Sequence, residues 1–313
     1  MTGGTGFIGR NLIPLLIKSG HEVVLLARSD RFLETFSVDG VATVSGDLLD
    51  RGSLEAAVSL TRPDAILHMA AVTPVRESWR DPRAFMETNY FGTINLVESV
   101  KRAQPSAIFI HYSTPEVLRP AESLRELGEG SDTYPTSPYA ASKLAAESYV
   151  RYSGLRSVVL RPANTYDRSS VAGVEEARGY FVEKAIIGVL TSDKVEFDGS
   201  SQSVRTWMHV SDHVKATSII VNEADRYVGR IVHIAPPNST ASCLSVYTAI
   251  VEKALEEGLI NRVPRSTWLN RPRPFDPQYL AVRGSPINGW SPMSLEEGLR
   301  AAVKNWARVL GVA

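Results

Sequence analysis

"MTGGTGFIGR" (residues 1–10) carries Gly3, Gly6 and Gly9 at intervals of three, directly ahead of an apolar helical pattern. Glycine is needed where the backbone must approach a phosphate closely, because a side chain would hold it away. The helix that follows offers unpaired N–H groups and the positive end of its dipole to an anion. A second apolar run, "HEVVLLA" (21–27), follows at the distance of the next strand. Together these features predict a dinucleotide-binding turn.

The chain begins unusually close to this loop. Such a loop normally leaves a buried strand, yet only Met1 and Thr2 precede Gly3. In a doubly wound sheet the first strand lies in the middle, so its absence would leave buried backbone groups unpaired, each costing ~1–3 kcal/mol. We therefore expect the natural gene product to start several residues earlier. The alternative is a degenerate relative that holds nucleotide poorly or not at all.

The first half of the chain alternates short apolar runs with helical patterns. Near-continuous apolar runs predict strands buried on both faces at 21–27, 41–46, 64–71, 106–113 and 156–162. Helices are predicted between them at 7–20, 51–60, 85–103 and 137–154. This alternation predicts an α/β fold with a doubly wound parallel (Rossmann) sheet.

The pattern loosens in the second half. Loops interrupt helices predicted at about 175–190, 211–223, 244–258 and 294–310. We predict a dinucleotide-binding domain at 1–163 and a smaller mixed lobe at 164–313 that binds substrate and returns some elements to the first domain.

Composition excludes several classes of protein. The chain has 34 basic and 34 acidic side chains, so no global field attracts nucleic acid or an anionic membrane. The single cysteine, Cys243, rules out an internal disulfide and fits a reducing compartment. No apolar run approaches the ~18 residues of a membrane span. We expect a cytoplasmic protein with no nucleic-acid or membrane partner.

The end of the second strand indicates which cofactor is bound. An NAD site usually has a carboxylate there that binds the ribose 2′-hydroxyl. This chain has Ala27, followed by Arg28, Ser29 and, slightly further on, Arg31. Since arginine can pair with a 2′-phosphate, NADP is favoured, with NAD as the alternative.

A possible acid–base pair lies in "PYAASK", where Tyr139 and Lys143 are four residues apart on one helix face. A nearby ammonium lowers the pKa of a phenol, which suits it to exchange a proton during carbinol–carbonyl interconversion. The preceding strand ends with Ser113 and Thr114, whose hydroxyls could bind the reacting oxygen.

At this point the chain resembles the extended short-chain dehydrogenases/reductases, in particular the nucleotide-sugar epimerase/dehydratase/reductase family. The motifs in order are "TGGTGFIG", "GDLLD", "HMAA", "ETNYFGTINLVES" with Asn89, "STPEV", "PYAASKLAAE", "RPANTYD", "RTWMHVSDHVKA" and "GWSPMSLEEGLRAAVKNW". They cover nearly the whole length.

The resemblance implies roles for many residues. It implies that Thr114, Tyr139 and Lys143 are catalytic. The implied cofactor contacts are Gly3, Gly6, Phe7, Ile8, Gly9, Arg28, Ser29, Asp47, Leu48, Ala70, Ala71, Tyr139, Lys143 and Pro162. The implied substrate contacts are Thr73, Glu116, Asn164, Arg205, Arg271 and Arg273. For Arg271 and Arg273, a solvated loop is an equally good interpretation.

Departures from the family pattern limit the reaction. The dehydratases place Asp-Glu after the catalytic threonine, whereas this chain has Pro115-Glu116 and so lacks the acid. The Asp after the diphosphate-binding arginine is Thr206 here. His209 and His213, with Asp212 between them, could suggest a metal site, but the family pattern places them on a strand end and a helix start, so no metal is expected.

The first hypothesis for function is NADPH-dependent 4-ketoreduction of a nucleotide-linked 4-keto-6-deoxyhexose. The second is a nucleotide-sugar epimerase with tightly bound NAD, which the same three catalytic residues would serve. The third is a non-catalytic nucleotide-binding relative. The family also implies a homodimer in which helices at about 82–103 and 138–153 form a four-helix bundle.

Overall fold

The computed structural model describes residues 1–28, 39–170, 173–270 and 277–312. By its internal contacts the chain divides into two compact units. The first unit contains Met1–Arg119, Asp132–Pro162 and Val214–His233, and the second contains Pro120–Ser131, Ala163–His213 and Ile234–Ala313. The assignment of cofactor to residues 1–163 and substrate to residues 164–313 stays a prediction.

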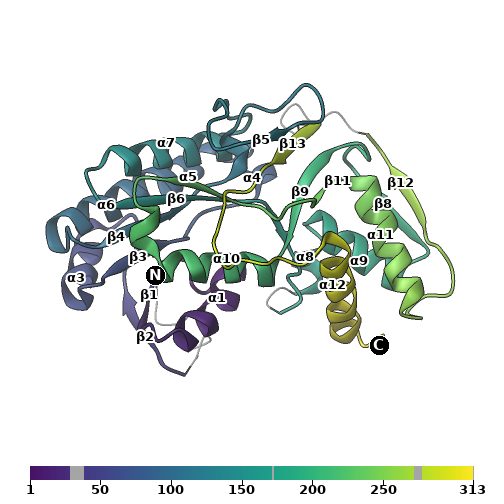
Figure 1. Cartoon of the computed structure of the whole chain (residues 1–313), viewed down its shortest axis with the longest axis horizontal. Helices are drawn as coiled ribbons and strands as arrows, with labels where there is room; N and C mark the ends of the chain where they lie inside the picture. The colour runs from purple at the N-terminus through teal and green to yellow at the C-terminus, as the bar shows by residue number, and fades with distance from the viewer. Residues whose placement is uncertain (29–38, 171–172, 271–276, 313) are drawn as a thin grey trace. The chain divides into compact units, whose positions relative to one another are not determined.

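The first unit is built on a sheet with parallel neighbours (Figure 1). In spatial order its strands are β10 (Ile231–Ile234), β6 (Ser157–Pro162), β4 (Ile108–Tyr112) and β3 (Ala65–His68), then, beyond Thr2, β1 (Val23–Ala27) and β2 (Val41–Ser45). Apart from the exposed strand β2, these strands carry mostly buried or half-buried side chains. Such burial fits the continuous apolar runs of the sequence.

Met1 and Thr2 lie between β1 and β3 and are hydrogen-bonded to both strands. The Leu26 N–H donates to the Met1 carbonyl at 2.9 Å, and the Thr2 N–H donates to the Leu67 carbonyl at 3.0 Å. The Met69 N–H donates to the Thr2 carbonyl at 3.2 Å. The two residues thus pair with strands on both sides, and the expectation that the natural gene product starts several residues earlier stays a prediction.

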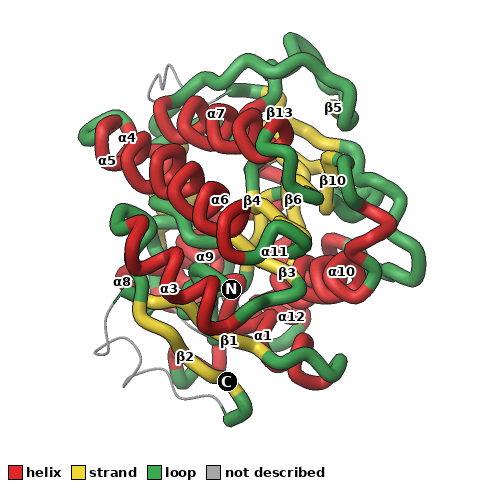
Figure 2. Tube along the Cα trace, turned by 90° about the vertical axis from the view of Figure 1, so that its left-hand side faces the viewer, coloured by secondary structure: helices red, strands yellow, loops and turns green. Residues whose placement is uncertain are grey.

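Helices cover both faces of this sheet. The helices of the first unit are α1 (Phe7–Lys18), α3 (Arg51–Thr61), α4 (Val75–Ser78), α5 (Pro82–Phe85), the π-helical turn Met86–Phe91, α6 (Gly92–Ala103) and α7 (Pro138–Tyr152), with 3₁₀ turns at Pro115–Val117 and Ala224–Tyr227. Helices α3, α6 and α7 lie side by side on one face (Figure 2). Helix α10 (Val210–Asn222) begins in the second unit and continues into the first, where Thr217 Oγ1 lies 2.7 Å from the Tyr112 hydroxyl. Because Tyr112 and His111 are adjacent in β4, their side chains point to opposite faces.

The second unit contains a mixed sheet and a separate strand pair. Its strands are β5 (Glu126–Leu127), β7 (Asn164–Tyr166), β8 (Lys194–Phe197), β9 (Val204–His209), β11 (Thr240–Ser242), β12 (Arg265–Trp268) and β13 (Tyr279–Val282). Strand β9 pairs with β7, β11 and β13, and β8 pairs with β12. The helices are α8 (Val174–Ala177), α9 (Phe181–Thr191), α11 (Cys243–Glu256) and α12 (Leu295–Leu310). Residues of α9, α11 and α12 form an apolar core around Trp306.

Two predicted helices and the end of one predicted strand need correction. The helix predicted at 85–103 is interrupted by the π turn Met86–Phe91, an extra residue in the helical repeat that no apolar pattern reveals. The helix predicted at about 175–190 is two helices, α8 and α9, with Tyr180 in extended conformation between them. The predicted strand 64–71 ends at His68, so Ala70 and Ala71 lie in the following loop.

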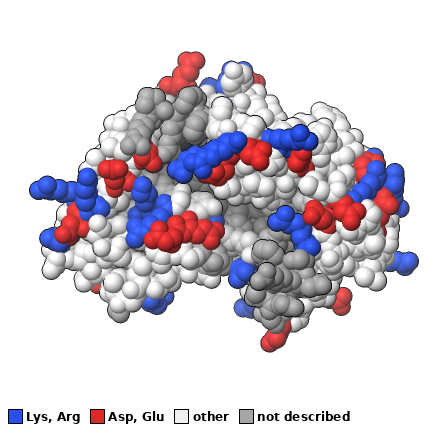
Figure 3. Space-filling view, turned by 180° about the vertical axis from the view of Figure 1, so that it is seen from behind, with Lys and Arg blue, Asp and Glu red and all other residues white. Residues whose placement is uncertain are grey.

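The charged surface agrees with the balanced composition. On the face drawn in Figure 3, basic and acidic side chains are interspersed. Among the helices of the described ranges, none has both the length and the apolar character that a membrane span requires.

Candidate active site

Several predicted cofactor residues of the first unit, and the predicted catalytic Thr114, lie at the carboxyl ends of its strands or just after them. Arg28 follows β1, Asp47 and Leu48 follow β2, and Ala70 and Ala71 follow β3. Thr114 follows β4, and Pro162 ends β6. Parallel neighbours present these ends at one edge of the sheet, which is where open α/β sheets bind ligands. Ser29, Arg31, Arg271 and Arg273 lie outside the described residues.

The glycine loop requires glycine for two different reasons. A Cβ at Gly3, whose φ is +71°, would lie 2.6 Å from the Ala70 nitrogen, and one at Gly9 would lie 2.5 Å from Gly4. A Cβ at Gly6 would meet only the Gly3 carbonyl oxygen, at 3.3 Å, and would otherwise enter open space. Gly6 is also the N-cap of α1, which has no side-chain cap and no acidic residue in its first turn. This cradle fits the pyrophosphate of a dinucleotide.

Helix α7 carries the predicted acid–base pair. Ser137 starts the helix by accepting the Ala140 N–H at 3.1 Å, and Pro138 occupies the first turn. Tyr139 is half-buried, and its ring meets the edge of Phe85, with centroids 6.2 Å apart at 87°. Lys143, one turn later, is 3% exposed.

Burial lowers the pKa of Lys143 to about 8, although the Glu147 carboxylate opposes this effect. Glu147 is itself held by Arg161 in a bidentate pair, with N–O distances of 3.0 and 2.6 Å. Ser113 Oγ also donates to Glu147 Oε2 at 2.8 Å. One of the two hydroxyls proposed for the reacting oxygen is therefore engaged in a buried ion pair.

Thr114 is the hydroxyl that fits the catalytic role. It caps the 3₁₀ turn Pro115–Val117, and its Oγ1 accepts the Glu116 N–H at 3.3 Å. Because the oxygen is the acceptor in this bond, its hydrogen can still be donated to a carbonyl oxygen. Pro115 begins the turn and has no ionisable side chain, and Glu116 is half-buried.

Two buried histidines near helix α7 were missed by the sequence analysis. Burial, followed by the charge of Lys143, lowers the pKa of His68 to about 3, and the same causes lower the pKa of His111. The two rings are 5.5 Å apart. Neither ring nitrogen of His111 has a hydrogen-bond partner among the described residues. Both histidines lie in predicted strands, but their shared face becomes visible only once β3 and β4 are paired.

Two predicted substrate residues lie in the second unit. Asn164 begins β7 and is exposed, while Arg205 in β9 is 8% exposed and donates to the Val204 carbonyl at 2.8 Å. Thr206 stands where the family has aspartate. Its hydroxyl oxygen accepts the Val282 N–H at 2.9 Å and lies 2.9 Å from Thr240 Oγ1, so it joins three strands. Thr73 is an exposed loop residue of the first unit.

The turn after β7 is held by buried polar side chains. Asp167 has a left-handed backbone, with φ +75°. Its carboxylate accepts hydrogen bonds from His209 Nε2 at 3.0 Å and from Asn305 Nδ2 at 2.8 Å. The Glu183 carboxylate accepts the Asp167 N–H, and burial raises the pKa of Glu183 to about 7. His213 instead contacts Thr165 Oγ1 at 2.9 Å, so His209 and His213 bind different partners.

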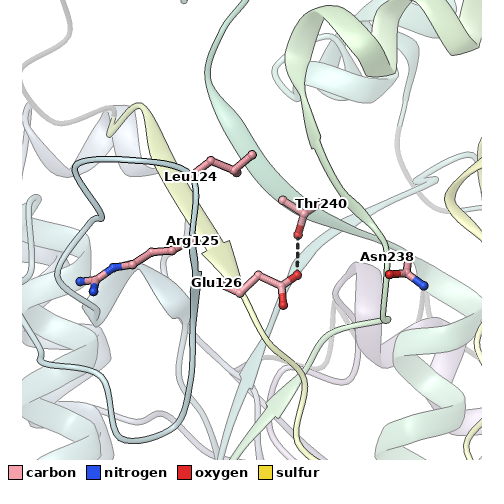
Figure 4. Close-up of a pocket in the computed structure, with 5 residues that line it drawn as sticks. All are labelled: Leu124, Arg125, Glu126, Asn238 and Thr240. Atoms are coloured by element: carbon pink, nitrogen blue, oxygen red, sulfur yellow. Dashed lines mark hydrogen bonds between the residues drawn. The ribbon is translucent and has the colours of Figure 1, made fainter.

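An open cavity of about 420 Å³ lies in the second unit (Figure 4). It is lined by Leu124, Arg125, Glu126, Asn238 and Thr240. Thr240 Oγ1 donates to Glu126 Oε1 at 3.2 Å, and Arg125 points away from this pair. None of these five residues was predicted to bind cofactor or substrate.

Residues 1–235 match the NAD dependent epimerase/dehydratase family. The chain belongs to this family. The resemblance inferred from the motifs and the predicted Rossmann fold are both confirmed.

Named relatives of this NAD dependent epimerase/dehydratase family member include two kinds of enzyme. The chain is 28% identical to the dTDP-glucose 4,6-dehydratase of Neisseria meningitidis serogroup B, over 97% of this chain and 91% of the relative. A crystal structure of the dTDP-glucose 4,6-dehydratase of Streptomyces venezuelae with NAD bound matches with a TM-score of 0.78, 26% identity and coverage of 99% and 97%. The UDP-glucose 4-epimerase of Thermotoga maritima, with UDP-glucose, matches with a TM-score of 0.77, 25% identity and coverage of 99% and 98%.

Proposed function

We propose that this protein transfers hydride to or from a sugar carbon of a nucleotide sugar without eliminating water. The observation that carries this proposal is Pro115. Dehydration needs an acid to protonate the leaving hydroxyl, and Pro115 stands directly beside Thr114, where the dehydratases of the family pattern have that acid. The remaining set of Thr114, Tyr139 and Lys143 serves carbinol–carbonyl interconversion.

In this proposal a bound nicotinamide supplies the hydride. The Tyr139 hydroxyl donates its proton to the carbonyl oxygen of the sugar, and Thr114 Oγ1 orients that oxygen by donating a hydrogen bond. The Lys143 ammonium, one turn away on α7, favours the phenolate left on Tyr139. Gly3, Gly6 and Gly9 would hold the cofactor's pyrophosphate, and Asn164 and Arg205 would bind the nucleotide sugar.

The preferred reaction is NADPH-dependent reduction of a 4-keto-6-deoxyhexose. Ala27 ends β1 without a carboxylate and Arg28 is exposed beside it, which favours a 2′-phosphate. The second candidate, an epimerase with retained NAD, is favoured by the likeness to the Thermotoga maritima epimerase.

The proposal is tested by incubating the purified protein separately with NDP-glucose and with an NDP-4-keto-6-deoxyhexose plus NADPH. We expect one NADPH consumed per keto-sugar reduced, and no product of NDP-glucose that is lighter by one water. Formation of the dehydrated product would contradict the proposal. Interconversion of epimers with tightly bound NAD and no net oxidation would replace reductase by epimerase.

Arg28→Ala tests the cofactor choice. If the guanidinium binds the 2′-phosphate, the variant loses roughly ten- to a hundredfold in NADPH affinity and keeps its NADH affinity, because a charge-assisted hydrogen bond contributes ~1.5–3 kcal/mol. Ala27→Asp should act in the same direction by repelling the phosphate. Titration of both cofactors against each variant checks this, and an equal loss for NADH and NADPH would make Arg28 a surface charge only.

We also propose the homodimer through residues of about 82–103 and 138–153. Phe91 supports it, because this large apolar side chain is 52% exposed within the first of these segments. Sedimentation at micromolar concentration should show a dimer, and Phe91→Asp should shift it toward monomer. A monomeric wild-type protein would refute the dimer.

A further inference from the structure

One helix face makes three contacts beneath the candidate active site. Phe85, Asn89 and Thr93 are four residues apart and are 2%, 1% and 0% exposed. In an α-helix, residues four apart advance slightly beyond a full turn, and the wider π turn at Met86–Phe91 reduces that excess. The three side chains therefore stay in line and face α7 and β3.

Asn89 joins the catalytic helix to the loop after β3. Its Nδ2 donates to the Val72 carbonyl at 3.0 Å, and its Oδ1 accepts the Val72 N–H at 2.8 Å. The second Nδ2 hydrogen is donated to Ser142 Oγ at 3.0 Å. Val72 directly follows Ala70 and Ala71, so one amide fixes both the predicted cofactor loop and α7.

Ser142 passes this link on to the catalytic tyrosine. It is completely buried, and its hydroxyl donates to the Tyr139 carbonyl at 2.7 Å. In an α-helix that carbonyl also pairs with the N–H four residues later, which is that of Lys143. The Ser142 hydroxyl thus holds the backbone of the helical turn that separates Tyr139 from Lys143.

The chain of hydrogen bonds extends to the glycine loop. Thr93 Oγ1 donates to the Asn89 carbonyl at 2.6 Å, so it must accept from His68 Nε2, at 2.9 Å. His68 Nδ1 is then the acceptor for Thr2 Oγ1, at 2.7 Å. Thr2, immediately before Gly3, is connected in this way to Tyr139, 137 positions along the chain.

We propose that Ser142 is a positioning residue that sets Tyr139 relative to Lys143. This inference rests on the proposed role of Tyr139 as proton donor. A buried serine in a helix interior usually bonds only within its own helix, as Ser99 does to the Asn95 carbonyl at 2.8 Å. Ser142 differs because a second element, through Asn89, fixes the orientation of its hydroxyl.

The test compares Ser142→Ala with Ser99→Ala, an equally buried serine on α6 that has no link to Tyr139. We expect Ser142→Ala to lower kcat roughly ten- to a hundredfold, because small displacements of a catalytic group cost this much, with KM for the nucleotide sugar within about threefold. Ser99→Ala should keep kcat, and Ser142→Cys, a weak donor of similar shape, should be intermediate. In a Tyr139→Phe background Ser142→Ala should have no further effect, since the group that it positions is gone.

A readout without substrate separates this inference from the proposed function. The titration of the Tyr139 phenol is measured as the absorbance difference between a protein and its Tyr139→Phe counterpart. In Ser142→Ala its midpoint should move to higher pH, because the Tyr139 hydroxyl would move away from the Lys143 ammonium that favours the phenolate. An unchanged midpoint, or an equal loss of kcat in both serine variants, would overturn the positioning role. Absence of turnover in the wild type would speak against the proposed function, while the titration would still decide the role of Ser142.

Discussion

Tyr139→Phe should lower turnover of the nucleotide sugar at least a thousandfold while leaving its affinity within a few-fold. The phenolic proton is transferred in the transition state and contributes little to binding of the ground state. The substitution keeps the ring that packs against the edge of Phe85, so the fold should be preserved. Steady-state kinetics together with direct titration of the nucleotide sugar check both parts of this expectation.

The matched control is Tyr152→Phe. Tyr152 lies on the same helix but is 82% exposed, so loss of its hydroxyl should leave kcat unchanged. Wild-type turnover in Tyr139→Phe would mean that another group donates the proton, and the role assigned to α7 would have to be abandoned.

Lys143→Met should abolish turnover and yet stabilise the free protein at pH 7. Burial lowers the pKa of Lys143 from 10.5 to about 8, so the folded state binds this proton less tightly than the unfolded state. The difference corresponds to a penalty of about 3 kcal/mol at pH 7, where the amine is charged in both states. Methionine has a similar length and no charge to bury, so the free energy of unfolding should rise by roughly 2–4 kcal/mol.

The pH dependence gives this prediction a second check. The wild-type penalty is complete below pH 8 and shrinks between pH 8 and about 10.5, because there the folded protein has already released a proton that the unfolded chain still holds. Urea unfolding at pH 7 and pH 10 should therefore show a smaller advantage of Lys143→Met at the higher pH. Lower stability of the variant at pH 7 would contradict the account of a buried, costly ammonium.

The sequence predicted those parts of the site that depend on local patterns. The backbone of Ala70 lies too close to Gly3, and that of Gly4 too close to Gly9, for a side chain at either position. Only glycine fits there, so the sequence shows glycines at a regular spacing. Tyr139 and Lys143 are one helical turn apart, so their common face follows from the spacing alone. Near-continuous apolar runs between helical patterns likewise predicted the parallel sheet, because strands buried on both faces need continuous apolar residues.

Features that depend on distant pairing could not be predicted in this way. His68 and Thr2 are hydrogen-bonded across 66 positions, and Asn89 and Ser142 across 53. The π turn adds one residue to a helix whose apolar pattern looks regular, and it was therefore missed. Thr206, which appeared in the sequence only as a lost aspartate, is a buried link between strands once β9 is paired.

The central claim, that hydride passes from NADPH to the keto carbon of the sugar without loss of water, is tested most directly with an NDP-4-keto-6-deoxyhexose and NADPH deuterated at C4 of the nicotinamide, using each stereoisomer in turn. The account predicts that one isomer transfers its deuterium to the carbon of the former keto group, which gives a product one mass unit heavier than the product made with unlabelled NADPH. Mass spectrometry and proton NMR of the purified nucleotide sugar would show that single label. A product without label from either isomer, or conversion of an NDP-hexose to a species lighter by one water, would contradict the account.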